Sequence, residues 1–134
     1  MRIYAVIDTN VFVSALLSRN SEAATTKVLN ALFGHKITPL YNEDILNEYD
    51  EVLHRGKFVF PQEDIDRILT SVTTLGVFAS RIESGEQFPD PDDAVFYEVA
   101  MSKDGAYVVT GNTKHFPRKP IVVTPAEMVK ILGI

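Results

Sequence analysis

The sequence predicts an α/β fold, specifically a three-layer α/β/α sandwich around a central, mostly parallel sheet. Strand-like and helix-like segments alternate along the whole chain of 134 residues. The first of them, Tyr4–Ile7, is a short apolar run, as expected for a strand buried on both faces of a sheet. Such alternation is typical of βαβ units, in which helices cover both faces of a parallel sheet.

The individual elements follow from short β-branched runs and from apolar residues at helical spacing. The expected strands span residues 4–7, 36–40, 77–79, 106–110 and 121–123. The expected helices span residues 11–17, 22–33, 43–54, 65–75, 92–103 and 125–132. Ser21, Asn42 and Thr124 are candidate N-caps, and Gly34 stands where a helix C′ residue would.

Length and composition predict one globular domain, residues 1–134, with 46% hydrophobic and 23% charged residues. No signal peptide is visible, and no apolar stretch is long enough to cross a membrane, so no membrane partner is expected. The absence of cysteine excludes disulfides and is compatible with the cytoplasm, where we expect the protein to act. The net charge of −5 argues against broad, non-specific nucleic-acid binding but does not exclude a nucleic-acid enzyme.

Acidic and amide side chains from four segments are expected at the carboxyl edge of this sheet, where open α/β proteins bind ligands. Asp8 directly follows the first strand, and Asn112 follows a later strand by two residues. Asp92 and Asp93 open a helix, and helix N-termini lie at this same edge. Glu48 lies about 40° outside the apolar stripe of its helix, so we expect it to point inward near the edge.

This combination of side chains predicts a site for a hard divalent cation. Crowded carboxylates repel one another and resist ionisation unless a cation joins them. Oxygen ligands favour Mg²⁺ or Mn²⁺, and such a site typically clamps a phosphate and activates water for in-line attack. The chain has no cysteine, and its three histidines lack ligand spacing, which argues against zinc.

Each of these residues also has a purely structural interpretation. Asp8 or Asn10 would serve as the cap of the helix that follows. Residues 90–93, Asp-Pro-Asp-Asp, fit a helix start, where the helix dipole favours acids. Glu48 alone fits a salt-bridge partner, and Asn112 alone fits a turn residue. Capping accounts for the acids at the helix start, but it does not explain why Glu48 should face inward.

The ordered set of motifs resembles the PIN domain, a small α/β nuclease family, over nearly the whole chain. The chain is most similar to the single-domain prokaryotic branch regarded as toxins of toxin–antitoxin pairs. The matching pieces are Asp8-Thr9-Asn10-Val11, residues 43–49, residues 89–93, residues 109–112 with His115-Phe116-Pro117, and residues 124–127. No single piece is specific to the family, whereas the ordered set is.

The resemblance implies a metal-dependent ribonuclease that hydrolyses phosphodiester bonds of single-stranded RNA with Mg²⁺ or Mn²⁺. Asp8, Glu48 and Asp93 match its catalytic, metal-binding acidic positions. Asp93 is preferred over the neighbouring Asp92, which stays a candidate metal ligand. The fourth acidic position of the family falls on Asn112, a neutral oxygen ligand that adds no negative charge. A second metal, if the mechanism uses one, would then be held less tightly.

Supporting and substrate-binding roles are expected for neighbours of these acids. Thr9, Asn10 and Thr110 are expected to orient the attacking water or to support the carboxylates. A basic cluster beside the site is expected to bind substrate: Lys114, His115, Arg118 and Lys119. Phe116 within this cluster has two interpretations, a ring that stacks on a base and a core anchor, and the cluster itself also fits a solvated loop.

Two other functional classes compete with the nuclease. The first is a non-catalytic or weakly active PIN-like module that binds RNA or protein, and Asn112 is its main support. The second is a phosphoacceptor domain, which needs paired acids at the first strand and a lysine after the last strand. Here only Asp8 lies at the first strand, and Lys119 precedes the last one. If the protein is a toxin, a protein antitoxin is expected to insert near the acidic groove, and homo-oligomers are also possible.

Overall fold

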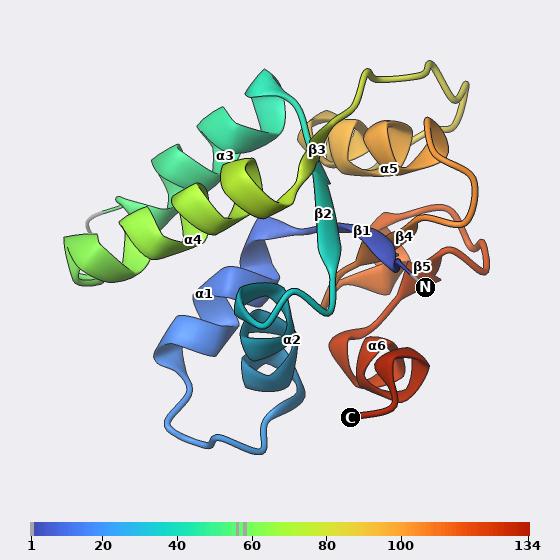
Figure 1. Cartoon of the computed structure of the whole chain (residues 1–134). Coiled ribbons are helices and arrows are strands. Elements are labelled where there is room, and N and C mark those ends of the chain that lie inside the picture. The colour runs from blue at the N-terminus through green and yellow to red at the C-terminus, as the bar shows by residue number, and fades with distance from the viewer. Residues whose placement is uncertain (1, 56, 58) are drawn as a thin grey trace.

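The structure, a computed structural model, describes residues 2–55, 57 and 59–134. Across these residues five parallel strands form one sheet in the order β3-β2-β1-β4-β5, with helices on both sides (Figure 1). The predicted fold class is therefore confirmed. The strands are β1 (Tyr4–Ile7), β2 (Thr38–Tyr41), β3 (Val77–Phe78), β4 (Tyr107–Val109) and β5 (Val122–Val123). The helices are α1 (Thr9–Leu17), α2 (Ala24–Phe33), α3 (Glu43–Leu53), α4 (Gln62–Leu75), α5 (Ala94–Met101) and α6 (Pro125–Leu132), with short 3-10 turns η1 (Pro91–Asp93) and η2 (Thr113–His115).

Strand β1 occupies the middle of the sheet and is its most buried strand. Tyr4 of β1 pairs with Thr38 of β2, and Ile7 pairs with Val109 of β4. The residues of β1 from Ala5 to Ile7 are buried, as the apolar run predicts. Because all neighbouring strands run in the same direction, the residue after β1 lies at the centre of the carboxyl edge.

The helices form two layers around the sheet (Figure 1). Helix α5 lies over β1 and β4 on one side, and α2 packs against α1 and α6 on the other side. Helices α3 and α4 run side by side near β2. Helix α5 is apolar nearly all round, and every residue from Ala94 to Ala100 is buried, so it belongs to the core rather than to the surface.

Two of the four residues predicted at helix ends, Asn42 and Thr124, are confirmed. The side chain of Asn42 accepts a hydrogen bond from the Ile45 N–H at 2.9 Å. Thr124 and Glu127 form a complete capping box at the start of α6. The prediction for Ser21 is wrong, since α2 begins at Ala24. Asn20 accounts for this difference, because its carbonyl and side chain accept the N–H groups of the next turn and hold that segment out of the helix.

Two other predictions differ from the structure by a few residues: the C-terminal end of α2 and the extent of the helix expected at 92–103. Gly34 is at the C-cap of α2 with φ −85°, and the left-handed residue is His35, with φ 64°. The Lys36 N–H bonds the Ala31 carbonyl at 2.8 Å, which completes a Schellman motif. The helix expected at 92–103 is divided into η1 and the shorter α5. Its start is capped by Asp90, whose side chain accepts the Asp92 N–H at 3.0 Å.

The long segment between β3 and η1 is fixed to α5 by a buried carboxylate. Glu98 accepts hydrogen bonds from Arg81 Nε and from the Ser84 N–H and hydroxyl, the last two at 2.8 and 2.7 Å. Burial by itself raises the pKa of Glu98, but the hydrogen bonds from Ser84 and Arg81 outweigh it and hold that pKa below its ordinary value. This carboxylate therefore orders the segment that leads into the acids of η1.

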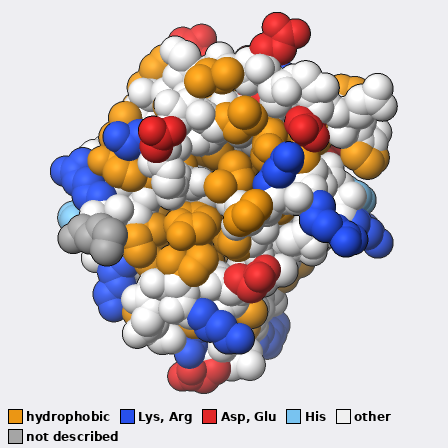
Figure 2. Space-filling view, turned by 90° about the vertical axis from the view of Figure 1, so that its right-hand side faces the viewer, with side chains coloured by type: hydrophobic (Ala, Val, Ile, Leu, Met, Phe, Trp, Pro, Cys, Tyr) orange, Lys and Arg blue, Asp and Glu red, His pale blue; other side chains and the backbone are white. Residues whose placement is uncertain are grey.

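Charge is unevenly distributed over the surface. Figure 2 shows the side of the molecule that carries β5 and α6, where hydrophobic side chains gather near the middle and Lys and Arg side chains stand on both flanks. The exposed hydrophobic residues at the end of α6 are Ile131 and Ile134. The net charge of −5 is therefore compatible with locally positive areas. Among the described residues, no helix combines the length and apolar character that crossing a membrane requires.

The anchoring by Glu98 predicts a pH-dependent contribution to stability. Glu98→Gln removes charge-assisted hydrogen bonds and should lower the free energy of unfolding at neutral pH by roughly 1–3 kcal/mol. Because the pKa of Glu98 in the folded protein lies below its ordinary value of 4.5, this contribution is full above that value and is lost as the pH falls through the folded-state pKa. Urea unfolding of both proteins from neutral to acidic pH measures the difference.

The matched control for this prediction is Glu83→Gln, which changes an exposed acid in the same segment. Its effect should be small at every pH. A loss in Glu98→Gln that stays constant into strongly acidic solution would show that the charge of Glu98 does not stabilise the fold.

Candidate functional site

Asp8 lies at the centre of the carboxyl edge and is almost completely buried, with 7% of its surface exposed. Its N–H continues the ladder by bonding the Val109 carbonyl at 2.9 Å, and its Oδ2 accepts a hydrogen bond from the Thr110 hydroxyl at 2.8 Å. Asp8 occupies the N-cap position of α1, where the backbone groups of Asn10 and Thr9 lower the pKa of its carboxyl group although no regular side-chain capping bond forms. Burial raises the pKa of Asp8, and the hydrogen bond from Thr110 partly opposes that shift.

Glu48 reaches the same edge because its neighbour on α3, Tyr49, is tied to the end of β1. The Tyr49 hydroxyl donates to the Ile7 carbonyl at 2.5 Å. The buried Tyr49 ring packs edge-on against Phe12, with centroids 5.0 Å apart, and also lies near Phe96. Burial raises the pKa of Tyr49, so its hydroxyl keeps the proton that makes this bond. The first residue after β1 and the first turns of α3 are thereby held together.

Glu48 and Asp92 line one small hollow. This hollow has a volume of about 310 Å³, and Arg81 and Glu51 also contribute to its walls. Glu48 is half-buried, and burial raises its pKa, followed by the charges of Glu51, Asp92 and Asp8. Glu48 therefore lies beside Asp92 and within electrostatic reach of Asp8.

The pKa of Asp93 is strongly raised. Burial, followed by the charges of Asp8 and Asp90, raises the pKa of Asp93 to about 6, and Glu48 adds a smaller contribution. The Nδ1 atom of His115 lies 3.9 Å from Asp93 Oδ2 and opposes the shift. The charge of Asp8 thus contributes to the raised pKa of both Glu48 and Asp93, as expected for like charges near one another.

The threonines and amides around Asp8 differ in their contacts. The Thr110 hydroxyl also accepts the Asn112 N–H at 3.0 Å, so one side chain links Asp8 to the segment after β4. Asn10 Oδ1 accepts the Gly111 N–H at 3.4 Å. The buried hydroxyl of Thr9 is among the few buried polar groups of the described residues that lack a partner. Asn112 is exposed at the rim of the site.

The basic residues that follow Asn112 lie in two different environments. His115 faces Asp93, whereas the other three members are exposed and line a separate hollow of about 390 Å³: Lys114, Arg118 and Lys119. Phe116 is buried, with its ring edge-on to Phe88 at a centroid distance of 6.0 Å. Of the two interpretations of Phe116, the structure therefore favours the core anchor over a base-stacking platform.

The oxygen atoms of these side chains are the kind of ligand that a hard divalent cation prefers. Asp8, Glu48 and Asp93 would supply carboxylate oxygens, and a cation among them would lower the pKa that each now has raised. The unpartnered Thr9 hydroxyl is a further oxygen beside Asp8. Within the part of the chain that the structure describes, no three acidic or histidine side chains are already close enough to hold one ion, so ion binding requires these side chains to move toward one another.

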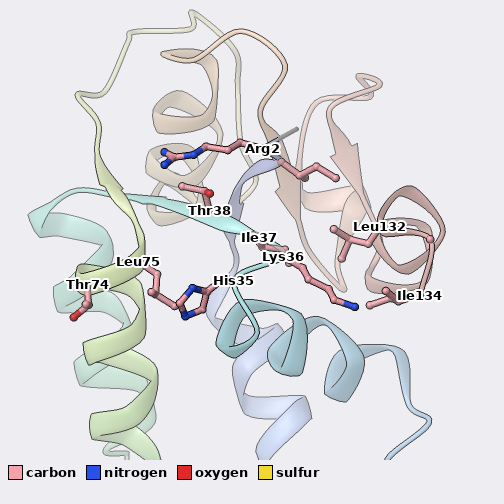
Figure 3. A pocket seen from close by; sticks show the side chains of 11 residues that line it. Arg2, His35, Lys36, Ile37, Thr38, Thr74, Leu75, Leu132 and Ile134 are labelled. Carbon is pink, nitrogen blue, oxygen red and sulfur yellow. The ribbon is translucent and has the colours of Figure 1, made fainter.

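A cavity larger than the two hollows described above lies at the opposite edge of the sheet, and different residues line it. It has a volume of about 610 Å³ and lies at the amino ends of β1 and β2 (Figure 3). Arg2, His35 and Lys36 line it together with apolar residues of α4 and α6. Figure 3 shows that the side chains of Arg2 and Lys36 point in opposite directions, so these cations do not converge on one point. The carboxylates of the candidate site are absent from its lining.

Two residues with clear positioning contacts were not predicted for these roles. Tyr49 was expected only as a member of the apolar stripe of its helix, although a buried tyrosine usually needs a partner for its hydroxyl. Glu98 is a lone carboxylate in the otherwise apolar run of α5, and a charge in such a run requires a partner when it is buried. The apolar-stripe tyrosine and the lone acid of an apolar helix can both be recognised in the sequence. The sequence does not show, however, that their partners are the Ile7 carbonyl and Arg81.

These features define a class of protein: a small parallel α/β domain with an acidic site at the carboxyl edge of its sheet. The PIN domain model matches residues 4–114, and the chain belongs to the PIN domain family. PIN domains are generally nucleases and typically depend on divalent metals. The chain is also similar to the uncharacterized protein MJ1680 of Methanocaldococcus jannaschii, with 30% identity over 115 residues, which covers 84% of this chain and 72% of that protein.

The link between α3 and β1 yields a prediction. Tyr49→Phe keeps the ring and removes only the donor to the Ile7 carbonyl, so it should lower the free energy of unfolding by roughly 1–3 kcal/mol. Tyr41→Phe serves as the control, because the Tyr41 hydroxyl has no hydrogen-bond partner among the described residues, and this variant should be near neutral. Denaturant unfolding compares the two, and equal small effects would show that the buried bond contributes nothing.

Proposed function

We propose that the protein is a Mg²⁺- or Mn²⁺-dependent endoribonuclease that hydrolyses phosphodiester bonds of single-stranded RNA. The observation that carries this proposal is that acids from three distant segments lie near the carboxyl end of β1, where the charge of the buried Asp8 raises the pKa of Glu48 and Asp93. Membership of the PIN domain family supports the nuclease class. The choice of RNA and of these metals rests on the donor chemistry and on the resemblance described above.

The residues of the site have distinct roles in this proposal. Asp8, Glu48 and Asp93 would hold the metal, with Asp92 and Asn112 as further oxygen ligands at the rim. A bound metal ion would supply Lewis-acid polarisation of the scissile phosphate and lower the pKa of an attacking water.

Neighbouring groups orient these ligands and hold the substrate. The Thr110 hydroxyl keeps Asp8 Oδ2 in place, and the N–H of Asn112 fixes that hydroxyl in turn. Thr9 and Asn10 lie on the first turn after Asp8, where they would orient water. The exposed cations of the loop after β4 would contact RNA phosphates, namely Lys114, Arg118 and Lys119, and His115 would assist from beside Asp93.

A second candidate is a non-catalytic or weakly active PIN-like module that binds RNA or a protein. The observation that favours it is Asn112, which is neutral, exposed and without a side-chain hydrogen bond of its own to η2. With one carboxylate fewer, the site would attract a second cation more weakly.

A biological setting follows as part of the same proposal. By resemblance, the protein would act in the cytoplasm as the toxin of a toxin–antitoxin pair, with a protein antitoxin covering the acidic site. Self-association would be compatible with either function, since hydrophobic side chains remain exposed on α6 and at β3.

Cleavage of RNA provides the direct test. Purified protein with Mn²⁺ should cleave a labelled single-stranded RNA, and Asp8→Asn and Asp93→Asn should each reduce the rate by about 100-fold or more, because each removes a metal ligand. Chelation by EDTA should abolish cleavage of the wild type. Identical low activity in all three proteins would support the binding module instead.

Restoring the fourth acid should raise metal affinity. Asn112→Asp adds a carboxylate at the rim and should lower the Mn²⁺ concentration required for half-maximal cleavage by roughly 10-fold. The control is Asn30→Asp, an equal charge change on an exposed position of α2. If both variants shift the metal requirement equally, net charge rather than ligation is responsible.

A further inference from the structure

Arg81 lies on the side of the acidic site opposite to the basic loop after β4. It follows β3, the strand at one edge of the sheet, whereas Lys114 and His115 follow β4, beyond β1 in the strand order. Asp8 follows β1 between them, and Glu48 on α3 follows β2. Since all strands are parallel, the segments after them lie along one edge in this order.

The guanidinium of Arg81 is anchored on only one of its sides. Its Nε donates to Glu98 Oε1, and the Glu98 side chain is 8% exposed whereas that of Arg81 is 43% exposed. A guanidinium carries five N–H donors, so four remain on the two terminal nitrogens. No other hydrogen bond or ion pair of Arg81 occurs with a described residue. The buried carboxylate therefore fixes the plane of the guanidinium and leaves its outer fork available to solvent.

The surroundings of this fork are otherwise acidic. Arg81 lines the hollow of about 310 Å³ that contains Glu48 and Asp92. It also lines a second hollow of about 630 Å³ with Glu83 and Glu86. In both linings Arg81 is the one cation among the described residues. A polyanion that approaches the acids from the β3 side thus meets the positive charge of Arg81 among acidic side chains.

We propose that Arg81 binds a backbone phosphate of single-stranded RNA on the β3 side of the acidic site. Arginine suits this task because its planar fork matches the geometry of phosphate oxygens and it stays charged at any physiological pH. The strand would cross the carboxyl edge from Arg81, over Asp8, to the basic loop after β4. This phosphate subsite rests on the proposed function, because it assumes that RNA is the ligand of the acidic edge.

Binding measurements on intact RNA test the subsite. All proteins carry Asp8→Asn so that a fluorescent single-stranded RNA stays intact, and its affinity is measured by anisotropy with Mn²⁺ at several salt concentrations. Adding Arg81→Gln should weaken binding by about 10-fold and reduce the slope of log affinity against log salt by roughly 0.7. Arg19→Gln is the control, since it removes an exposed arginine in the segment after α1, at the end of that helix away from Asp8.

A double variant separates phosphate binding from the role of Arg81 in folding. Arg81→Gln alone leaves Glu98 buried without its cationic partner, so it should also lower stability. Adding Glu98→Gln removes that buried charge and should recover part of the stability, while RNA binding stays about 10-fold weak. Recovery of RNA affinity together with stability would overturn the subsite, because the arginine would then act only through the fold.

Cleavage kinetics distinguish failure of the subsite from failure of the proposed function. In the otherwise unchanged protein, Arg81→Gln should raise KM for RNA by about 10-fold and change kcat less. If the wild type binds RNA without cleaving it, the nuclease proposal fails while the affinity loss in Arg81→Gln still supports the subsite. If RNA binds equally well with and without Arg81, or does not bind at all, the subsite is excluded.

Discussion

The hydrogen bond from Tyr49 to the Ile7 carbonyl is the contact on which the arrangement of the acidic edge depends. It joins the helix after β2 to the end of the central strand, and it does so one residue away from both Glu48 and Asp8. Packing of the Tyr49 ring against Phe12 then connects the same point to α1. Three segments that are far apart in the chain are therefore fixed relative to one another by a single buried side chain.

The acids at the carboxyl edge suit a binding site but reduce the stability of the folded protein. Burial raises the pKa of Asp8, Glu48 and Asp93, and the charge of Asp8 raises those of Glu48 and Asp93 further, so keeping all three charged disfavours the folded state. Ligands that bind only the folded protein offset such a cost. The contrast with Glu98 is informative, because that buried carboxylate has donors on Arg81 and Ser84, and its pKa is lowered. Hydrogen-bond donors thus outweigh the effect of burial on the pKa of Glu98 but not on that of Asp8.

The general architecture could be predicted from sequence because parallel topology determines it. Once strands and helices alternate, every strand end and helix start falls at one edge, which places Asp8, Glu48, Asp93 and Asn112 near one another without any knowledge of side-chain conformation. Details that depend on local competition could not be predicted. Asn20 takes the N–H groups that Ser21 was expected to cap, and the ring of Phe116 turns into the core. The partner of Glu98 is 17 residues away in a segment without periodicity, so no sequence pattern identifies it.

The two outermost strands, β3 and β5, contain only two residues each. A sheet normally ends in unpaired N–H and C=O groups, and a long, flat row of them recruits strands from other molecules. Because β3 and β5 are so short, neither outer strand offers a template for a strand of another chain, although Phe78 on β3 is exposed and hydrophobic. The short length of the two outer strands thus protects the sheet against edge-to-edge aggregation.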